Sequence, residues 1–178
     1  FAYVDGSSIE AMGDLSITAK NQAIIHSGVD AGAVAIGGGL VGGAASGAGT
    51  DSVNRIEVDV IARIADTIGD GIIAQDVLVQ ADDEAIIRAT TLAASLAASF
   101  GLFGGSVSIS VSLADNTIAD SSKALVDNAD ILAGGDLTNK SRENSDISAE
   151  SQSVSMSASV SICFSLAGGC AKAEATIE

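Results

Sequence analysis

Carboxylates are the residues of this sequence whose type and spacing most suggest chemistry. Asp14, Asp76 and Asp136 recur in similar surroundings, and Asp82 and Asp83 form an adjacent pair. Carboxylate oxygens are the hard ligands that Ca²⁺ takes in proteins, so these five residues are candidate calcium ligands. We interpret them first as solvated turn residues, because equivalents about 60 residues apart should lie too far from one another to share an ion. A calcium site would need different aspartate columns to converge.

No combination of residues predicts an enzyme. His26 is the only histidine, and the sequence pairs no serine or cysteine with it for a hydrolytic triad. The stretch 37–42 satisfies the G-x-G-x-x-G pattern of dinucleotide-binding loops, but no helical pattern follows it. The sequence therefore predicts no catalytic residue and no cofactor, and Ca²⁺ is the one ion that its carboxylates could bind.

The two cysteines, Cys163 and Cys170, flank a Gly-Gly bend. Each is out of phase with the apolar residues that alternate along its segment, so both thiols should project from the same side. We predict a disulfide across the bend, which implies an oxidising compartment. The sequence leaves open the alternative of two free cysteines that pack as small apolar side chains.

The composition is that of an acidic protein built from small and β-branched side chains. Apolar residues make up 47% of the 178 residues, yet only 3% are aromatic and proline is absent, which favours closely packed strands. The chain has 23 acidic and 8 basic residues, a net charge of −15, which repels nucleic acid and anionic lipid surfaces. The most apolar run, 91–103, is too short to cross a bilayer. We therefore expect no nucleic-acid partner and no membrane insertion.

Three copies of one unit account for the sequence. An aspartate landmark recurs at steps of 62 and 60 residues, and a Gly-Gly landmark keeps a similar step. These landmarks divide the chain into repeats at 1–61, 62–123 and 124–178. A unit of this kind can bury its apolar side only against its neighbours, so we predict that the three repeats stack as one continuous domain.

Within each repeat, apolar and polar residues alternate with a period of two. The segment 106–113 alternates Ser with Val, Ile or Leu, and 153–164 alternates over a longer stretch. This pattern predicts strands whose apolar side is buried and whose serine side forms hydroxyl ladders on the outer face. The segment 91–103 also places apolar residues at helical spacing, but we assign it as strand because its counterparts are glycine-rich or strictly alternating.

Stacked strands of this kind predict an all-β fold, a β-solenoid resembling a parallel β-helix. Because solenoid coils ordinarily use about 20 to 45 residues, each repeat should form two or three coils. Equivalent residues would then lie about 10 to 14 Å apart along the axis. The alternative is a stack of antiparallel β-hairpins or a β-sandwich, with the Gly-Gly landmark as the hairpin turn.

The alternation, the Gly-Asp turns and the 60-residue step resemble the repeat regions of very large bacterial surface proteins, the filamentous-haemagglutinin-like and adhesin-like proteins. The resemblance is carried by 2–19, 62–81 and 124–138, together with the Gly-Gly segments. It implies a secreted, elongated β-solenoid at the cell surface, with adhesion or matrix formation as its role. The Gly-Gly-x-Gly-x-Asp nonapeptides of calcium-loaded toxin repeats are absent from the sequence.

We therefore expect a structural or adhesive module of an extracellular protein or filament, an elongated rod formed by stacked repeats. Its partners would be neighbouring repeats, identical subunits stacked end to end, and a host or neighbouring-cell surface. The alternative is a surface-recognition module that binds glycan or another ordered surface through a flat face rich in Ser and Thr.

Overall fold

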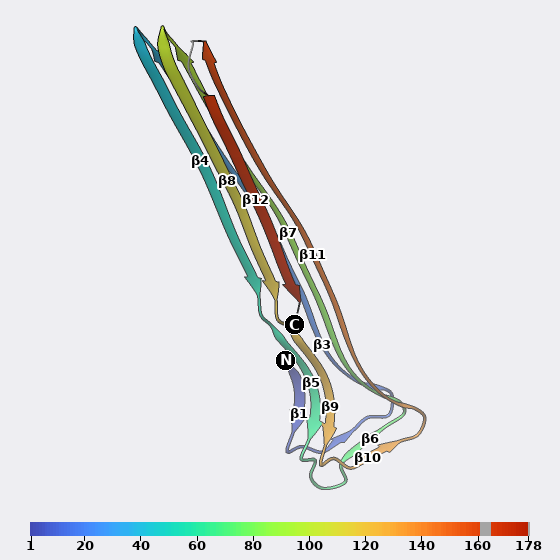
Figure 1. The fold of residues 1–178 in the computed structure, drawn as a ribbon. Coiled ribbons are helices and arrows are strands. Elements are labelled where there is room, and N and C mark those ends of the chain that lie inside the picture. The colour runs from blue at the N-terminus through green and yellow to red at the C-terminus, as the bar shows by residue number, and fades with distance from the viewer. Residues whose placement is uncertain (161–164, 178) are drawn as a thin grey trace.

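The computed structural model describes residues 1–160 and 165–177 and shows an all-β protein (Figure 1). These described residues form strands and no helix. The strands are β1 (Ala2–Asp5), β2 (Ile9–Glu10), β3 (Leu15–Gly38), β4 (Val41–Ile56), β5 (Asp59–Ala65), β6 (Ile72–Ala74), β7 (Val77–Phe100), β8 (Phe103–Ile118), β9 (Ser121–Asp127), β10 (Ile131–Ala133), β11 (Leu137–Val160) and β12 (Ser165–Ile177).

The chain passes three times through the same four sheets, and each pass is called a layer below. The layers are β1 to β4, β5 to β8 and β9 to β12, and the sheet orders are β1-β5-β9, β10-β6-β2, β11-β7-β3 and β12-β8-β4. All the described strand pairs are parallel. Leu15 pairs with Val77, which pairs with Leu137, so equivalent residues lie in register. This arrangement is compatible with a β-helix-like fold.

One layer corresponds to one step of the sequence repeat. Asn21 and Asp83, which are 62 residues apart, lie on paired strands and share a hydrogen bond. Equivalent residues are therefore one strand spacing apart, about 4.8 Å. The expectation of two or three coils per repeat, with equivalents 10 to 14 Å apart, is wrong. Antiparallel pairing is also wrong for the described strands, because the hydrogen bonds join parallel strands of successive layers.

Two sheets of very long strands explain why one layer uses so many residues. β3, β7 and β11 each contain 24 residues, whereas strands usually contain five or six. At about 3.3 Å per residue, each extends about 80 Å. β4 and β8 return alongside β3 and β7, so the two long sheets face each other and run in opposite directions (Figure 1). The strand assignment of 91–103 is confirmed, apart from a bend at 101–102.

Glycine allows the bend between the two long sheets. Gly39 has a φ of +146°, a backbone conformation that other residues rarely adopt. A Cβ atom on Gly101 would clash with the carbonyl oxygen of Gly39, so the bends of the first two layers touch through their backbones. In the first two layers the Gly-Gly landmark therefore follows a bend between two sheets and is not the turn of a hydrogen-bonded hairpin. The third pair, Gly168 and Gly169, lies within β12 in register with Ile109 and Ser110, so the expected bend at that pair is wrong.

The aliphatic core lies at the base, the end of the molecule where the short first and second sheets meet the start of the long third sheet (Figure 1). Ile64 and Ile72 are completely buried there, and Val79 of β7 packs against them. The buried apolar residues of this core are Ile17, Ala19, Val60, Ala62, Ile64, Ile72, Ala74, Val77, Val79 and Ala81. The base therefore has the apolar interior that the alternating pattern predicts.

Between the long sheets the interior is apolar near the base, where Ile56, Ile87 and Ile118 are buried, and polar towards the bend, which reverses the prediction for most of β8. Ser106 and Ser108 are at most 1% exposed, whereas Ile109 is 54% exposed. The prediction that serine forms the outer face is wrong there, because the two sheets lie too close together for the bulkier aliphatic side chains. A Cβ atom on Gly42 would lie only 2.7 Å from the carbonyl oxygen of Phe100. Small residues therefore fill the gap, and the larger apolar residues point outwards.

We expect Ser108→Val to destabilise the protein and Ile109→Ser to have little effect. The valine would force methyl groups into a filled gap and leave the hydroxyl of Ser95 without its 2.7 Å partner, at a cost of about 2 to 4 kcal/mol. The serine would replace a side chain that already faces solvent. Urea unfolding measures both changes, and the opposite ranking would show that serine lies outside.

Candidate functional site

A chain of hydroxyl groups connects the three layers between the long sheets. Thr50 of β4 donates a hydrogen bond to Ser112 of β8 at 2.9 Å, and Ser112 donates to Thr91 of β7 at 2.7 Å. Thr91 donates to Ser151 of β11 at 3.0 Å, and Ser151 donates to the main-chain carbonyl of Ser112 at 2.9 Å. Each hydroxyl has a partner, so the network joins the two sheets and favours one register of the layers.

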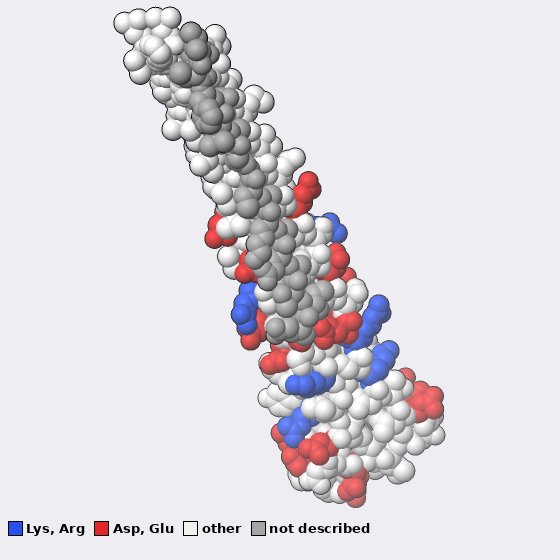
Figure 2. Space-filling view, in the orientation of Figure 1, with Lys and Arg blue, Asp and Glu red and all other residues white. Residues whose placement is uncertain are grey.

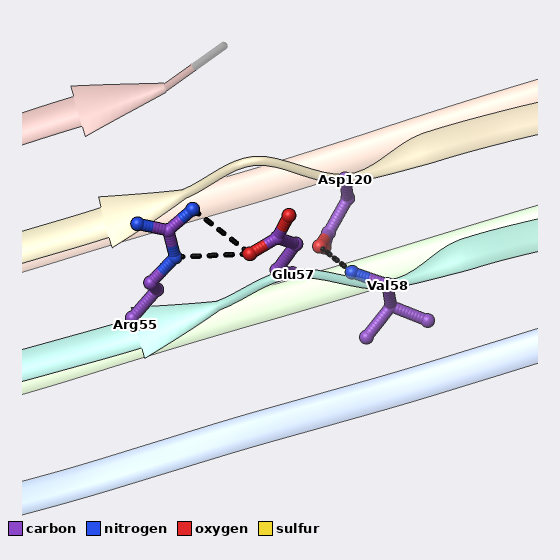
Figure 3. A network of polar contacts seen from close by, with 4 residues as sticks. All are labelled: Arg55, Glu57, Val58 and Asp120. Carbon is purple, nitrogen blue, oxygen red and sulfur yellow. Dashed lines mark hydrogen bonds and ion pairs between the residues drawn. The ribbon is translucent and has the colours of Figure 1, made fainter.

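A second polar cluster lies where the base meets the long sheets. Asp83 is 2% exposed and Asp120 is 8% exposed. Asn21 donates to Asp83 at 2.7 Å, and the main-chain N–H of Val58 donates to Asp120 at 2.7 Å (Figure 3). Burial first, and then the neighbouring Asp83 carboxyl and the charge of Glu143, raise the pKa of Asp120 to about 6, although the Val58 hydrogen bond acts in the opposite direction. The cluster therefore takes up a proton under mildly acidic conditions.

Three of the candidate calcium ligands form a column on the surface. Asp14, Asp76 and Asp136 immediately precede β3, β7 and β11, whose first residues pair in register. All three are exposed, and Oδ1 of Asp76 accepts a hydrogen bond from the main-chain N–H of Asp136 at 2.8 Å. The expectation that equivalent carboxylates lie too far apart to share an ion is wrong, because one layer separates them by about 4.8 Å.

The other two candidates lie further along β7 and do not join that column. Asp82 and Asp83 are consecutive, so their side chains project from opposite faces of the sheet. Gln80 donates a hydrogen bond to Asp82, and Asp83 faces the interior. Over residues 1–160 and 165–177, no group of three or more His, Cys, Asp or Glu side chains is arranged to hold a metal ion. The structure therefore does not bring the five carboxylates together.

The remaining sequence candidates have separate positions. His26 is exposed on β3, in register with Arg88. The glycine pattern at 37–42 forms the bend between the long sheets. The predicted disulfide falls outside the described residues, because the structure does not describe Cys163 or the side chain of Cys170.

Side chains also pair with their counterparts in the next layer, a feature that the sequence reasoning missed. Asn21 donates to Asp83, and Asn54 donates to Oδ1 of Asn116, each at 2.7 Å and across 62 residues. Such ladders require that equivalent residues lie one strand spacing apart. Complementary amide and acid residues at a fixed offset of 62 were visible in the sequence, and they could have predicted direct stacking.

No family model, no curated protein and no solved structure matches this chain. Among the described residues, no helix has the length and hydropathy needed to cross a membrane.

The raised pKa of Asp120 predicts that the variant Asp120→Asn changes how stability depends on pH. The folded state holds the Asp120 proton up to about pH 6, whereas the unfolded chain releases it near 3.8. The contribution of Asp120 to stability is therefore fully present below about pH 4 and is lost as the pH rises through 6. Asparagine keeps an acceptor for the Val58 N–H and carries no charge.

We expect Asp120→Asn to be neutral near pH 4 and to stabilise the protein by about 2 kcal/mol at pH 7.5, as measured by urea unfolding at both values. Asp115→Asn, on the exposed face of β8, is the matched control and should have the same small effect at both pH values. An effect of Asp120→Asn that does not vary with pH would contradict the assignment.

Proposed function

We propose that this chain is a structural and adhesive module of an extracellular bacterial surface protein or filament, and that its layers are the coils of a β-solenoid. The observation that carries the proposal is the parallel pairing of equivalent residues in all four sheets. A chain that pairs with itself in this way is extended by any further layer of the same pattern. The bacterial surface setting is supported by the resemblance of the repeats to adhesin-like proteins.

The thickness and the length of one layer determine the shape of a stack of such modules. Each layer adds about 4.8 Å along the stacking direction but extends about 80 Å along its strands. The long dimension in Figure 1 is that of the strands, so stacking widens the molecule into a ribbon before it makes a rod. A large number of layers gives a broad, stiff wall rather than a thin spacer, which suits matrix formation and the display of one long edge.

The outer strands of the sheets support assembly between identical subunits. β3 and β11 each present one edge that no strand covers in the described structure, and an uncovered edge is a template for strand addition. A second copy stacked in the same register would place Asn21 of one copy beside Glu143 of the other. It would also place Gln22 beside Asn144. Both pairs can form hydrogen bonds between amide and oxygen.

The serine rows that suggested the alternative function, a glycan-binding face, lie between the long sheets. Ser108, Ser110 and Ser112 are completely buried.

Joining two copies of the chain in tandem tests the proposed stacking. If the layers continue in one solenoid, small-angle X-ray scattering should show a particle that is thicker by about 14 Å, which is three strand spacings, with nearly the same largest dimension. The monomeric chain is the control. A largest dimension that nearly doubles would mean two separate bodies in a row and would rule out the stacked module.

A further inference from the structure

The end of the long sheets that includes the bend carries no charged residue. This uncharged end consists of residues 31–50 and 93–112 and, in the third layer, 153–160. Figure 2 shows it as the white end of the molecule, with all the red and blue residues nearer the base. The nearest charged residues on the long strands are of both signs: Asp30 and Asp51 in the first layer, Arg88 and Asp115 in the second, and Glu150 and Lys172 in the third. The charge of the protein is therefore confined to one part of its length.

Both outer faces of the uncharged end are apolar, and so is its bend. On the outer face of the third sheet, Val34 is 68% exposed and a shallow apolar groove passes between the layers. On the outer face of the fourth sheet, Ile109 is 54% exposed. The exposed apolar residues of the uncharged end are Val34, Ile36, Leu40, Val41, Phe100, Leu102, Phe103, Val107, Ile109, Val111, Val154, Met156 and Val160. This surface is larger than the scattered apolar residues that soluble proteins expose.

The distribution of polarity is inverted relative to a protein surrounded by water. Serine and threonine hydroxyls lie inside the uncharged end and satisfy one another, for example Ser95 with Ser108 at 2.7 Å. Valine, isoleucine and phenylalanine lie outside, where each forfeits about 25 cal/mol for every Å² of apolar surface left in water. An apolar surrounding removes that cost without exposing a hydroxyl. Because both faces and the bend are apolar, a second copy docked on one face would leave most of this surface in water.

The length of the uncharged end matches part of a bilayer. On β3 it runs from residue 31 to 38, about 23 Å at 3.3 Å per residue, which exceeds one leaflet of about 15 Å and is shorter than the hydrocarbon core of about 30 Å. The uncovered edges of β3 and β11 carry unpaired backbone groups that hydrocarbon does not hydrate, so each further residue of edge that enters the bilayer adds a cost and limits the insertion to one leaflet. Further layers of a stack would pair these edges and remove that cost.

We propose that the uncharged end inserts, bend first, into one leaflet of a zwitterionic lipid bilayer. The charged residues just behind it would meet the headgroups, and because the protein carries a net charge of −15, an anionic membrane would repel it. This inference concerns a surface that the stacking proposal does not use, and it departs from the expectation of no membrane insertion that the overall composition suggested. In a stacked ribbon, the uncharged ends of successive layers would form one continuous apolar edge.

The sequence contains no tryptophan, so single tryptophans can report insertion. Ile109→Trp places the reporter on the uncharged end, and Leu125→Trp, at a site 41% exposed on β9, places it at the base. With phosphatidylcholine vesicles that contain brominated lipid, we expect a blue shift and strong quenching for Ile109→Trp and neither for Leu125→Trp. Equal responses of the two reporters would overturn the proposal.

Charged substitutions test which surface binds. Val34→Asp and Ile109→Asp lie on the uncharged end, and their matched controls are Val53→Asp and Ile24→Asp, whose side chains are equally exposed outside it. The affinity for vesicles, measured by co-sedimentation, should fall at least tenfold for the first pair and stay unchanged for the controls. The midpoint of urea unfolding shows whether each variant is folded. Loss of binding in both pairs would contradict the assignment.

Three further results would overturn the proposal. The first is that the wild-type chain does not bind phosphatidylcholine vesicles. The second is tighter binding to anionic phosphatidylglycerol vesicles, which would indicate an electrostatic surface site. The third is that sedimentation shows a dimer, that the Val34→Asp variant is monomeric, and that the wild-type chain does not bind vesicles. This result would assign the surface to a second copy of the chain. The tandem scattering experiment is independent of all three, so either proposal can fail alone.

Discussion

Parallel hydrogen bonding between equivalent residues of successive layers is the interaction on which the rest of this structure depends. It places each residue about 4.8 Å from its counterpart some 60 residues away, so each side chain lies beside the side chain at the equivalent position of the next layer. Amide and acid side chains of successive layers therefore form hydrogen-bonded ladders, as Asn21 and Asp83 do. Burial is the main cause of the raised pKa of Asp120. The Asp83 carboxyl, which lies close to Asp120 within the same layer, and Glu143, the counterpart of Asp83 in the next layer, raise this pKa further.

The narrow gap between the two long sheets is the second constraint, and it decides which residues face outwards. At the base, the first, second and third sheets enclose enough space for isoleucine and valine, and the core there is aliphatic. Towards the bend, the backbones approach until a Cβ at Gly42 would contact Phe100, so only Ser, Ala, Thr and Gly fit inside. The larger apolar residues are displaced to the surface. The inverted polarity of the uncharged end is thus a consequence of packing geometry, and it leaves a surface that needs an apolar partner.

The sequence was sufficient to predict strands, because period-two alternation is a local signal. The fixed repeat step favoured parallel stacking, with antiparallel hairpins as the alternative. The sequence could not predict how many coils one repeat forms, since a step of about 60 residues fits one coil of long strands as well as several coils of short ones. Nor could it predict which side of an alternating strand is buried: Ser108 and Ile109 exchange places if the strand rotates by half a turn. The cluster around Asp120 depends on segments far apart in the chain, so no local pattern reveals it. The candidate calcium ligands were found, but their spacing was misjudged because it depends on the coil length.

The most direct test of the central claim is a disulfide between two layers. With both native cysteines replaced by serine, the pair Thr18→Cys and Gln80→Cys occupies positions that face each other on β3 and β7. If one repeat forms one layer, oxidation of the folded protein should join the two thiols within the same chain, because disulfides require Cα atoms closer than about 7 Å. The displaced pair Thr18→Cys and Glu84→Cys should not be joined. Failure of the first pair to form the bond, as expected if equivalent residues lay about 10 to 14 Å apart, would contradict the account.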